Sequence, residues 1–257
     1  LRPRKKFEQR LELLHINDWK EFFKGKKVTL MGLGLLGRGL GDAIFLAEQG
    51  VDLLITDIRD EKTLAPSLAK LKRYKNIRYT LGRHKLEDFR NRDFIIKAAG
   101  VALDSLYIAE AVKNKIPIEM DASLFAKLMP KGVTLVGVTG TRGKSTTTAL
   151  IYEILSSSAP LQRGSAESAR RRGVFKGGNL VPKATLPLLE KVNPPAGGGD
   201  IVVLELDSWQ LQGFHDAKIS PQVAIFTTFL DDHLIYYKGD QARYFEDKVA
   251  IFKYQKA

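Results

Sequence analysis

The sequence contains no cysteine and no apolar run long enough to cross a membrane. The absence of cysteine excludes disulfide bonds and metal sites built on thiolates. A membrane-spanning helix needs about 20 consecutive, mostly apolar residues, and no stretch of this chain meets that requirement. The first residues, LRPRKKFEQR, are basic and lack the apolar core of a signal peptide. These features predict a cytoplasmic protein with no membrane partner.

The composition is that of a globular protein with a large excess of positive charge. The 257 residues are 44% hydrophobic and 27% charged, and the length fits one large or two ordinary domains. A formal net charge of +12 suits either nucleic acid or small anionic substrates. The basic residues are spread along the chain, and no strand interleaves them with aromatic residues as RNA-binding modules do. We therefore expect small anionic substrates and no nucleic-acid partner.

The stretch VTLVGVTGTRGKSTTT, residues 133–148, predicts a phosphate-binding turn. An apolar strand leads through glycines into a helix that is expected from Lys144 onward. Such a turn directs unpaired N–H groups and the positive end of the helix dipole toward one point. Lys144 is then expected to reach the β- and γ-phosphates, and the Ser145 hydroxyl to bind Mg²⁺. Val138 stands where the general P-loop pattern has its first glycine, so an ordinary glycine-rich turn is the alternative.

A second glycine-rich turn lies near the N-terminus. An expected strand ends at Met31 and leads into Gly32, Gly34 and Gly37, spaced as G-x-G-x-x-G. The next strand ends at Asp57, 20 residues after the last of these glycines. This βαβ pattern is typical of dinucleotide binding, with the acidic residue on a ribose. The glycines suit any nucleotide whose diphosphate lies at a helix start, so the pattern alone leaves the ligand open.

The alternation of strands and helices predicts an α/β protein of two domains. Residues 1–121 are expected to form a Rossmann-like, doubly wound domain, and residues 122–257 an incomplete P-loop NTPase-like central domain. The polar, Ser- and Arg-rich stretch 156–173 is expected to be a mobile loop. The expected strands are 27–31, 51–56, 78–80, 94–97, 116–119, 133–138, 201–206 and 223–228, and residues 174–179 are expected to be a strand end that opens into a loop. The expected helices, besides the one from residue 144, are 5–24, 42–49, 105–114, 123–128, 185–191 and 240–254.

Three polar residues after the phosphate turn are candidates for chemistry. Glu205 lies near the carboxyl end of an apolar strand, where a carboxylate following a P-loop unit often holds Mg²⁺; a structural ion pair is the alternative. His233 follows two aspartates and is either a metal ligand or a surface histidine. Lys248 shares a helix face with Tyr244 and Phe252, so it is partly buried if that face packs inward. Otherwise it is a lysine whose ammonium reaches solvent.

Together these motifs resemble, in order and spacing, the ATP-dependent Mur ligases of peptidoglycan synthesis. The similarity covers nearly the whole chain and is greatest to the branch of the family that adds D-glutamate. The segments that carry it are GLGLLG at 32–37, DIR at 57–59, EMDASLF at 119–125, TGTRGKST at 139–146, GGN at 177–179, ELDSWQL at 205–211 and DDH at 231–233, with Lys248 fifteen residues further on.

The resemblance implies an amide ligase. In that family ATP phosphorylates the carboxylate of a UDP-linked muramoyl peptide precursor, and the amine of an amino acid, here D-glutamate, attacks the acyl phosphate. It implies one Mg²⁺ on Ser145 and Glu205 and a second on His233 and a carbamylated Lys248, because a carbamate turns the lysine into an anionic metal ligand. Lys144, His233 and Lys248 are the implied catalytic residues, and we expect a monomer. The implied ATP-binding residues are Gly140, Thr141, Arg142, Gly143, Lys144, Ser145 and Thr146, and the implied precursor-binding residues are Gly32, Gly34, Leu36, Gly37, Asp57, Arg59, Gly100 and Asn179.

Several positions depart from the family pattern. Asp207 replaces a serine and adds negative charge beside the expected metal site, and Thr227-Thr228 replaces an asparagine. The alternatives are therefore a non-catalytic or decayed nucleotide-binding module, or another ligase of the superfamily, such as a different Mur ligase or a folate polyglutamate ligase. The family also has a third, C-terminal domain that binds the incoming amino acid. We expect these 257 residues to lack that domain and to be inactive on their own.

Overall fold

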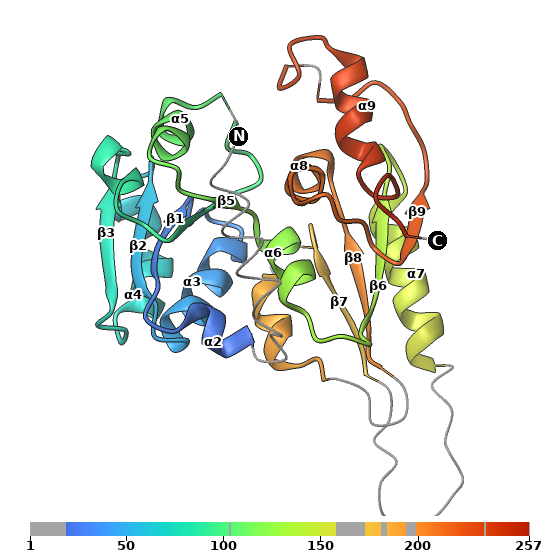
Figure 1. Cartoon of the computed structure of the whole chain (residues 1–257), viewed down its shortest axis with the longest axis horizontal. Helices are drawn as coiled ribbons and strands as arrows, with labels where there is room; N and C mark the ends of the chain where they lie inside the picture. The colour runs from blue at the N-terminus through green and yellow to red at the C-terminus, as the bar shows by residue number, and fades with distance from the viewer. Residues whose placement is uncertain are drawn as a thin grey trace, which may run out of the picture. The chain divides into compact units, whose positions relative to one another are not determined.

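The computed structural model describes residues 19–102, 104–157, 173–180, 184–193, 199–233 and 235–256 (Figure 1). It divides into two compact units, one made of Leu1–Leu124 with Val181–Pro187 and the other of Phe125–Leu180 with Leu188–Ala257. The expected domains 1–121 and 122–257 differ from this division mainly in the segment 181–187. Most of the expected helix 5–24 and of the expected loop 156–173 lies outside the described residues.

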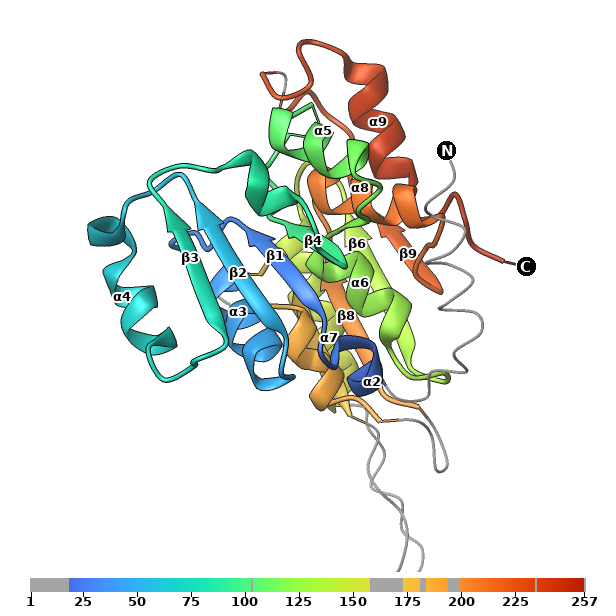
Figure 2. The ribbon, with the colours of Figure 1, turned by 60° about the vertical axis from the view of Figure 1, so that its left-hand side comes forward.

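The first unit is built on a five-stranded parallel sheet in the order β3-β2-β1-β4-β5. Figure 2 shows β3, β2, β1 and β4 side by side. This order is that of a doubly wound sheet, so the expected α/β class is confirmed. Helix α4 was not among the expected elements, and it contains Pro66, a residue that usually ends helices. The elements are α2 Trp19–Phe23, β1 Lys27–Met31, α3 Arg38–Glu48, β2 Asp52–Asp57, α4 Glu61–Leu71, β3 Ile77–Leu81, the 3₁₀ helix η1 Leu86–Phe89, β4 Phe94–Lys97, α5 Leu106–Lys113 and β5 Ile118–Glu119.

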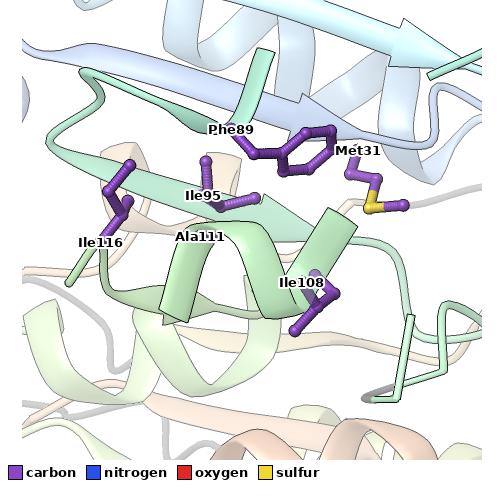
Figure 3. Packing of buried hydrophobic residues seen from close by; sticks show 6 residues of the cluster. All are labelled: Met31, Phe89, Ile95, Ile108, Ala111 and Ile116. Carbon is purple, nitrogen blue, oxygen red and sulfur yellow. The ribbon is translucent and has the colours of Figure 1, made fainter. Parts of the chain in front are cut away.

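Helices cover both faces of this sheet. Successive side chains of a strand point to opposite faces, so neighbouring residues of β4 enter different cores. Phe94 contacts Phe23 of α2, which packs edge-on against Phe45 of α3. Ile95 belongs to the core beneath α5 (Figure 3), which consists of Met31, Phe89, Ile95, Ile108, Ala111 and Ile116.

A short segment from later in the chain packs on α3. Ala184 lies so close to Gly41 that a Cβ on the glycine would be 2.6 Å from the Cβ of Ala184. The N–H of Leu186 donates to the carboxyl group of Asp42, which is 4% exposed and whose Oδ1 has no partner among the described residues. Burial, followed by the nearby charge of Asp121, raises the pKa of Asp42 well above its usual value. The segment therefore covers a buried carboxyl group of the first unit.

The second unit contains a four-stranded parallel sheet in the order β7-β8-β6-β9. Helix α7 packs on β6, β7 and β8, and its residues Ile151 and Leu155 contact the core formed by Val136, Val138, Ile201 and Val203. The expected helix 185–191 is a 3₁₀ helix, and the expected helix 240–254 ends earlier. Helices α6 Asp121–Leu128 and η2 Leu186–Glu190 straddle the boundary between the units. The other elements are β6 Thr134–Thr139, α7 Lys144–Ser157, β7 Val174–Gly178, β8 Ile201–Glu205, α8 Ser208–Ala217, β9 Val223–Phe226 and α9 Gln241–Val249.

Parallel pairing determines where the candidate site lies. The carboxyl ends of β7, β8, β6 and β9 meet at one edge of the sheet, and the candidate residues follow those ends. In the described part of the chain, no helix has the length and apolar character needed to cross a membrane.

Candidate active site

Residues 140–143, called the phosphate turn below, join β6 to α7 in the second unit, where the sequence predicts a turn between a strand and a helix. Gly140 has φ +143°, and a Cβ there would lie 2.0 Å from Oγ1 of Thr227. Gly143 also has a positive φ, +82°. Only glycine adopts such conformations readily, which explains both positions. The first turn of α7 contains no acidic residue, so its N–H groups and dipole favour an anion.

Two lysines converge on one carbonyl oxygen of this turn. Nζ of Lys144 donates to the carbonyl oxygens of Gly140 and Thr141 at 2.9 and 3.0 Å, and Nζ of Lys248 donates to that of Gly140 at 2.8 Å. Lys248 is 1% exposed, so the interpretation of a lysine with its ammonium in solvent is wrong. Burial, followed by the positive charge of Lys144, lowers the pKa of Lys248 to about 8.

Glu205, at the end of β8, is a buried carboxylate with one unused oxygen. Asn179 donates its side-chain amide to Oε1 at 3.2 Å and its backbone N–H to the Glu205 carbonyl at 2.7 Å. Oε2 is buried and has no hydrogen-bond partner among the described residues. No ion pair within those residues involves Glu205, which argues against the structural ion pair. A buried carboxylate oxygen with free lone pairs suits a divalent cation.

His233 lies on the segment that follows β9. Its backbone has φ +55°, its N–H donates to Oδ1 of Asp232 at 2.9 Å, and its ring centre lies 4.7 Å from that of Trp209. Within the described chain, no hydrogen bond or ion pair joins His233 to Glu205 or Lys248. Nor do three His, Asp or Glu side chains gather there into a metal site of their own. Mg²⁺ usually takes one or two protein carboxylates and completes its shell with phosphates and water, so a dispersed ligand set fits it.

The residues that depart from the family pattern have local roles. Asp207 is the N-cap of α8. Its carboxylate accepts the N–H of Gln210 at 2.7 Å, and the side-chain oxygen of Gln210 accepts the N–H of Asp207. Its charge also opposes the lowering of the Lys248 pKa. Thr228 accepts the N–H of Arg142 at 2.9 Å. Asp207 thus caps a helix and Thr228 holds the phosphate turn, so both residues have structural roles beside the site.

In the first unit, Asp57 supports the glycine turn. Its Oδ2 accepts the N–H of Gly34 at 2.9 Å, and its Oδ1 accepts the backbone N–H of Arg59 at 2.9 Å and its guanidinium at 3.3 Å. Asp57 is 1% exposed. The structure thus uses this carboxylate to hold the turn and Arg59, whereas the sequence pattern placed it on a ribose.

The other candidates of the first unit follow neighbouring strands. Gly32 has φ +101°, and a Cβ there would meet that of Ala98 at 2.9 Å. Gly37 is the N-cap of α3, whose first turn has no acidic residue, and Leu36 beside it is exposed. Gly100 follows β4. Because β2, β1 and β4 are adjacent and parallel, these residues and Arg59 share the carboxyl edge of the sheet.

Sequence reasoning did not assign roles to Tyr244 and Trp209. Tyr244 is buried, shares a hydrogen bond of 3.2 Å with the Thr141 hydroxyl, and lies beneath Lys248, whose Nζ is 5.0 Å from its ring centre. Its position four residues before Lys248 was the available signal. The tilted ring contact between Trp209 and His233 had no signal in the sequence, because it joins separate segments.

The two units define a class of protein in which a Rossmann-like unit precedes a P-loop nucleotide-binding unit. The family model described as Mur ligase MurD-like, N-terminal domain matches residues 26–119, and the Mur ligase middle domain matches residues 138–257. The chain therefore belongs to the Mur ligase family, a family of amide ligases.

Curated relatives agree with this assignment. The chain is 36% identical to UDP-N-acetylmuramoylalanine–D-glutamate ligase of Treponema pallidum over 92% of its own length and 43% of the relative. It is 36% identical to the ligase of the same name from Roseiflexus sp. over 90% of its own length and 45% of the relative. The chain thus spans less than half the length of these relatives.

A solved structure supports the fold. UDP-N-acetylmuramate:L-alanyl-gamma-D-glutamyl-meso-diaminopimelate ligase from Neisseria meningitides superposes with a TM-score of 0.53 at 15% identity. The match covers 90% of this chain and 69% of that one.

Proposed function

We propose that the chain is the precursor- and ATP-binding part of a ligase that joins D-glutamate to UDP-N-acetylmuramoyl-L-alanine through an acyl phosphate. The names of its relatives support the substrates. One observation carries the proposal for the chemistry. The phosphate turn follows β6, Glu205 with its unused oxygen ends the adjacent strand β8, and the buried Lys248 of α9 donates to the Gly140 carbonyl of the turn.

In this proposal the second unit binds Mg²⁺ and ATP. Ser145 and Oε2 of Glu205 hold one Mg²⁺, and Lys144 leaves its carbonyl partners for the β- and γ-phosphates. The amides of Gly143, Ser145 and Thr146 face the phosphates at the start of α7. Bound Mg²⁺ neutralises charge between the phosphate and the substrate carboxylate.

Lys248 and His233 are proposed to serve a second metal ion. The neutral amine of Lys248 adds to the carbon of CO₂ and releases one proton, which yields an anionic carbamate. The carbamate nitrogen keeps one N–H, enough to retain the bond to the Gly140 carbonyl. Burial lowers the pKa of Lys248 to about 8, which raises the fraction of the neutral amine that reacts with CO₂.

The first unit is proposed to bind the UDP group. The N-terminus of α3, behind Gly32, Gly34 and Gly37, offers amides to the diphosphate, and Arg59, held by Asp57, supplies a cation. Leu36 and Gly100 flank this edge. Asn179, next to Glu205, is proposed to contact the reactive end of the precursor.

Calorimetry with the chain as it stands tests these assignments. We expect Mg·ATP and UDP-N-acetylmuramoyl-L-alanine each to bind, and Glu205→Gln to weaken only Mg·ATP. Failure of Mg·ATP to bind would favour the decayed module instead. Incubation with ¹³C-bicarbonate should give a carbamate signal in the ¹³C spectrum that is lost in Lys248→Met.

A further inference from the structure

Thr141 lies in the phosphate turn, but its polar groups face the protein. Its N–H donates to the Thr228 carbonyl at 2.8 Å. Its hydroxyl accepts the N–H of Leu230 at 3.0 Å, donates to the Leu230 carbonyl at 3.1 Å, and lies 3.2 Å from the Tyr244 hydroxyl. A hydroxyl has one donor and two acceptor positions, so these partners satisfy it fully. Thr141 is 5% exposed.

The partners of Thr141 lead to both candidate metal ligands. Leu230 immediately precedes the segment 231–233 that ends in His233. Tyr244 is one helical turn before Lys248 on α9, and its ring stacks on that of Phe229 at 5.4 Å. One buried hydroxyl therefore joins the phosphate turn to two segments about 90 and 100 residues away in sequence.

A second set of hydrogen bonds holds the phosphate turn to the chain that follows β9. The Thr228 hydroxyl accepts the N–H of Arg142 at 2.9 Å and donates to the Arg142 carbonyl at 3.2 Å. Thr227 also donates to the carbonyls of Thr139 and Arg142. The phosphate turn is thus hydrogen-bonded along its length to the chain that leaves β9.

We propose that Thr141 is a positioning residue that couples occupancy of the phosphate turn to the placement of His233 and Lys248. This inference rests on the proposed function, because it assumes that nucleotide binds at the turn. A displacement of the turn by nucleotide is transmitted through the Thr141 hydroxyl to Leu230 and Tyr244. Without the hydroxyl, the Leu230 N–H loses its acceptor, and the segment leading to His233 is no longer held in register with the turn.

The two tryptophans allow a direct test. In protein labelled with 5-fluorotryptophan, Trp209 reports on His233, whose ring it contacts, and Trp19 in the first unit is an internal control. We expect saturating Mg·ATP to shift the ¹⁹F resonance of Trp209 and to leave that of Trp19 unchanged. Trp19→Phe assigns the two resonances.

The variants separate coupling from folding. Thr141→Val removes the hydroxyl but keeps the branched shape, and it should reduce the Trp209 shift to less than half at saturation. Thr141→Ser, which keeps the hydroxyl, should preserve the shift. Thr148→Val is the matched control, because Thr148 is fully buried on α7 and its hydroxyl has no partner among the described residues. Tyr244→Phe removes one of the three partners and should give an intermediate shift.

The outcomes are distinct. A full Trp209 shift in both Thr141→Val and Tyr244→Phe would overturn the inference and leave the proposed function intact. If calorimetry detects no Mg·ATP binding to the parent chain, the proposed function fails and the inference fails with it. If Thr141→Val does not fold, Tyr244→Phe decides: an undiminished shift overturns the coupling and a reduced shift supports it.

Discussion

Nζ of Lys248 donates a hydrogen bond of 2.8 Å to the carbonyl oxygen of Gly140, 108 residues earlier in the chain. The same carbonyl accepts Lys144. Two lysines, the buried Lys248 and the half-buried Lys144, therefore share one neutral acceptor, and the charge on Lys248 costs folding free energy when no anion is bound nearby. A phosphate at the turn or a carbamate on Lys248 would supply that anion.

The first prediction concerns the stability cost of Lys248. Its pKa is lowered from 10.5 to about 8, which corresponds to about 3 kcal/mol. The unfolded chain binds this proton more tightly, so the cost is fully present below about pH 8 and disappears as the pH rises through 10.5. Lys248→Met should therefore stabilise the protein at pH 7, by up to about 3 kcal/mol, and much less at pH 10.

Urea denaturation in CO₂-free buffer at the two pH values measures this difference. Lys191→Met, at an exposed position, is the control and should be neutral at both. A Lys248→Met variant that is less stable than the parent at pH 7 would contradict the prediction.

The second prediction concerns the unused oxygen of Glu205. Glu205→Gln keeps the shape and the contact with Asn179 but removes the negative charge, so ATP should lose its Mg²⁺-dependent gain in affinity by at least tenfold, about 1.4 kcal/mol. Calorimetry with Mg²⁺ and with EDTA measures that gain. Glu153→Gln, on the exposed side of α7, should retain it. Equal gains in the two variants would exclude Glu205 as a ligand.

The third prediction concerns the space at Gly140. Gly140→Ala places a Cβ against Oγ1 of Thr227 and also forces the alanine to a φ of +143°, which costs about 1–3 kcal/mol by itself. We expect a lower melting temperature and at least a tenfold loss of ATP affinity. Gly25→Ala has a φ of +66° and open space around the added Cβ, so it shows the cost of a left-handed alanine without a clash. Equal melting temperatures and equal ATP affinities in the two variants would contradict a role for the space at Gly140.

The fourth prediction concerns Asp42 in the first unit. The pKa of Asp42 is raised in the folded state, so the folded chain binds this proton more tightly than the unfolded chain does. Protonated Asp42 therefore stabilises the protein at low pH, and this stability is lost as the pH rises from the unfolded value of 3.8 through the folded pKa. Asp42→Asn should remove this loss and make the protein more stable than the parent at pH 8. Thermal unfolding between pH 5 and 8 measures the slope. Asp60→Asn retains a side chain able to cap α4 and should keep the parental slope.

The sequence predicted β4, β6, β8 and β9 well because each is an apolar run that leads into glycine or polar residues. It predicted the two glycine turns for a different reason: Gly140 and Gly32 adopt backbone conformations that other residues avoid, so glycine marks these positions. Strands β7 and β8 pair in parallel, so their carboxyl ends lie at the same edge of the sheet. This pairing is enough to bring Glu205 and Asn179 together.

The directions of polar side chains were not predictable in this way. The resemblance placed Thr141 among the ATP-binding residues, and the βαβ pattern placed Asp57 on a ribose. Neither indicated that both side chains form inward hydrogen bonds that hold turns. Their partners, Leu230 and Gly34, are fixed by tertiary packing that no local pattern contains. The burial of Lys248 likewise depends on what α9 packs against, and periodicity identified only its face.

Segment 184–187 has a practical consequence for dissecting the protein. The chain leaves the first unit after Leu124, returns for Val181–Pro187 and leaves again, so no single cut separates the two halves cleanly. A fragment that stops at Leu124 would bare Gly41 and deprive the Asp42 carboxyl of the Leu186 amide. Production of an autonomous N-terminal half would need that strip of chain grafted back, or Asp42 replaced by an apolar residue.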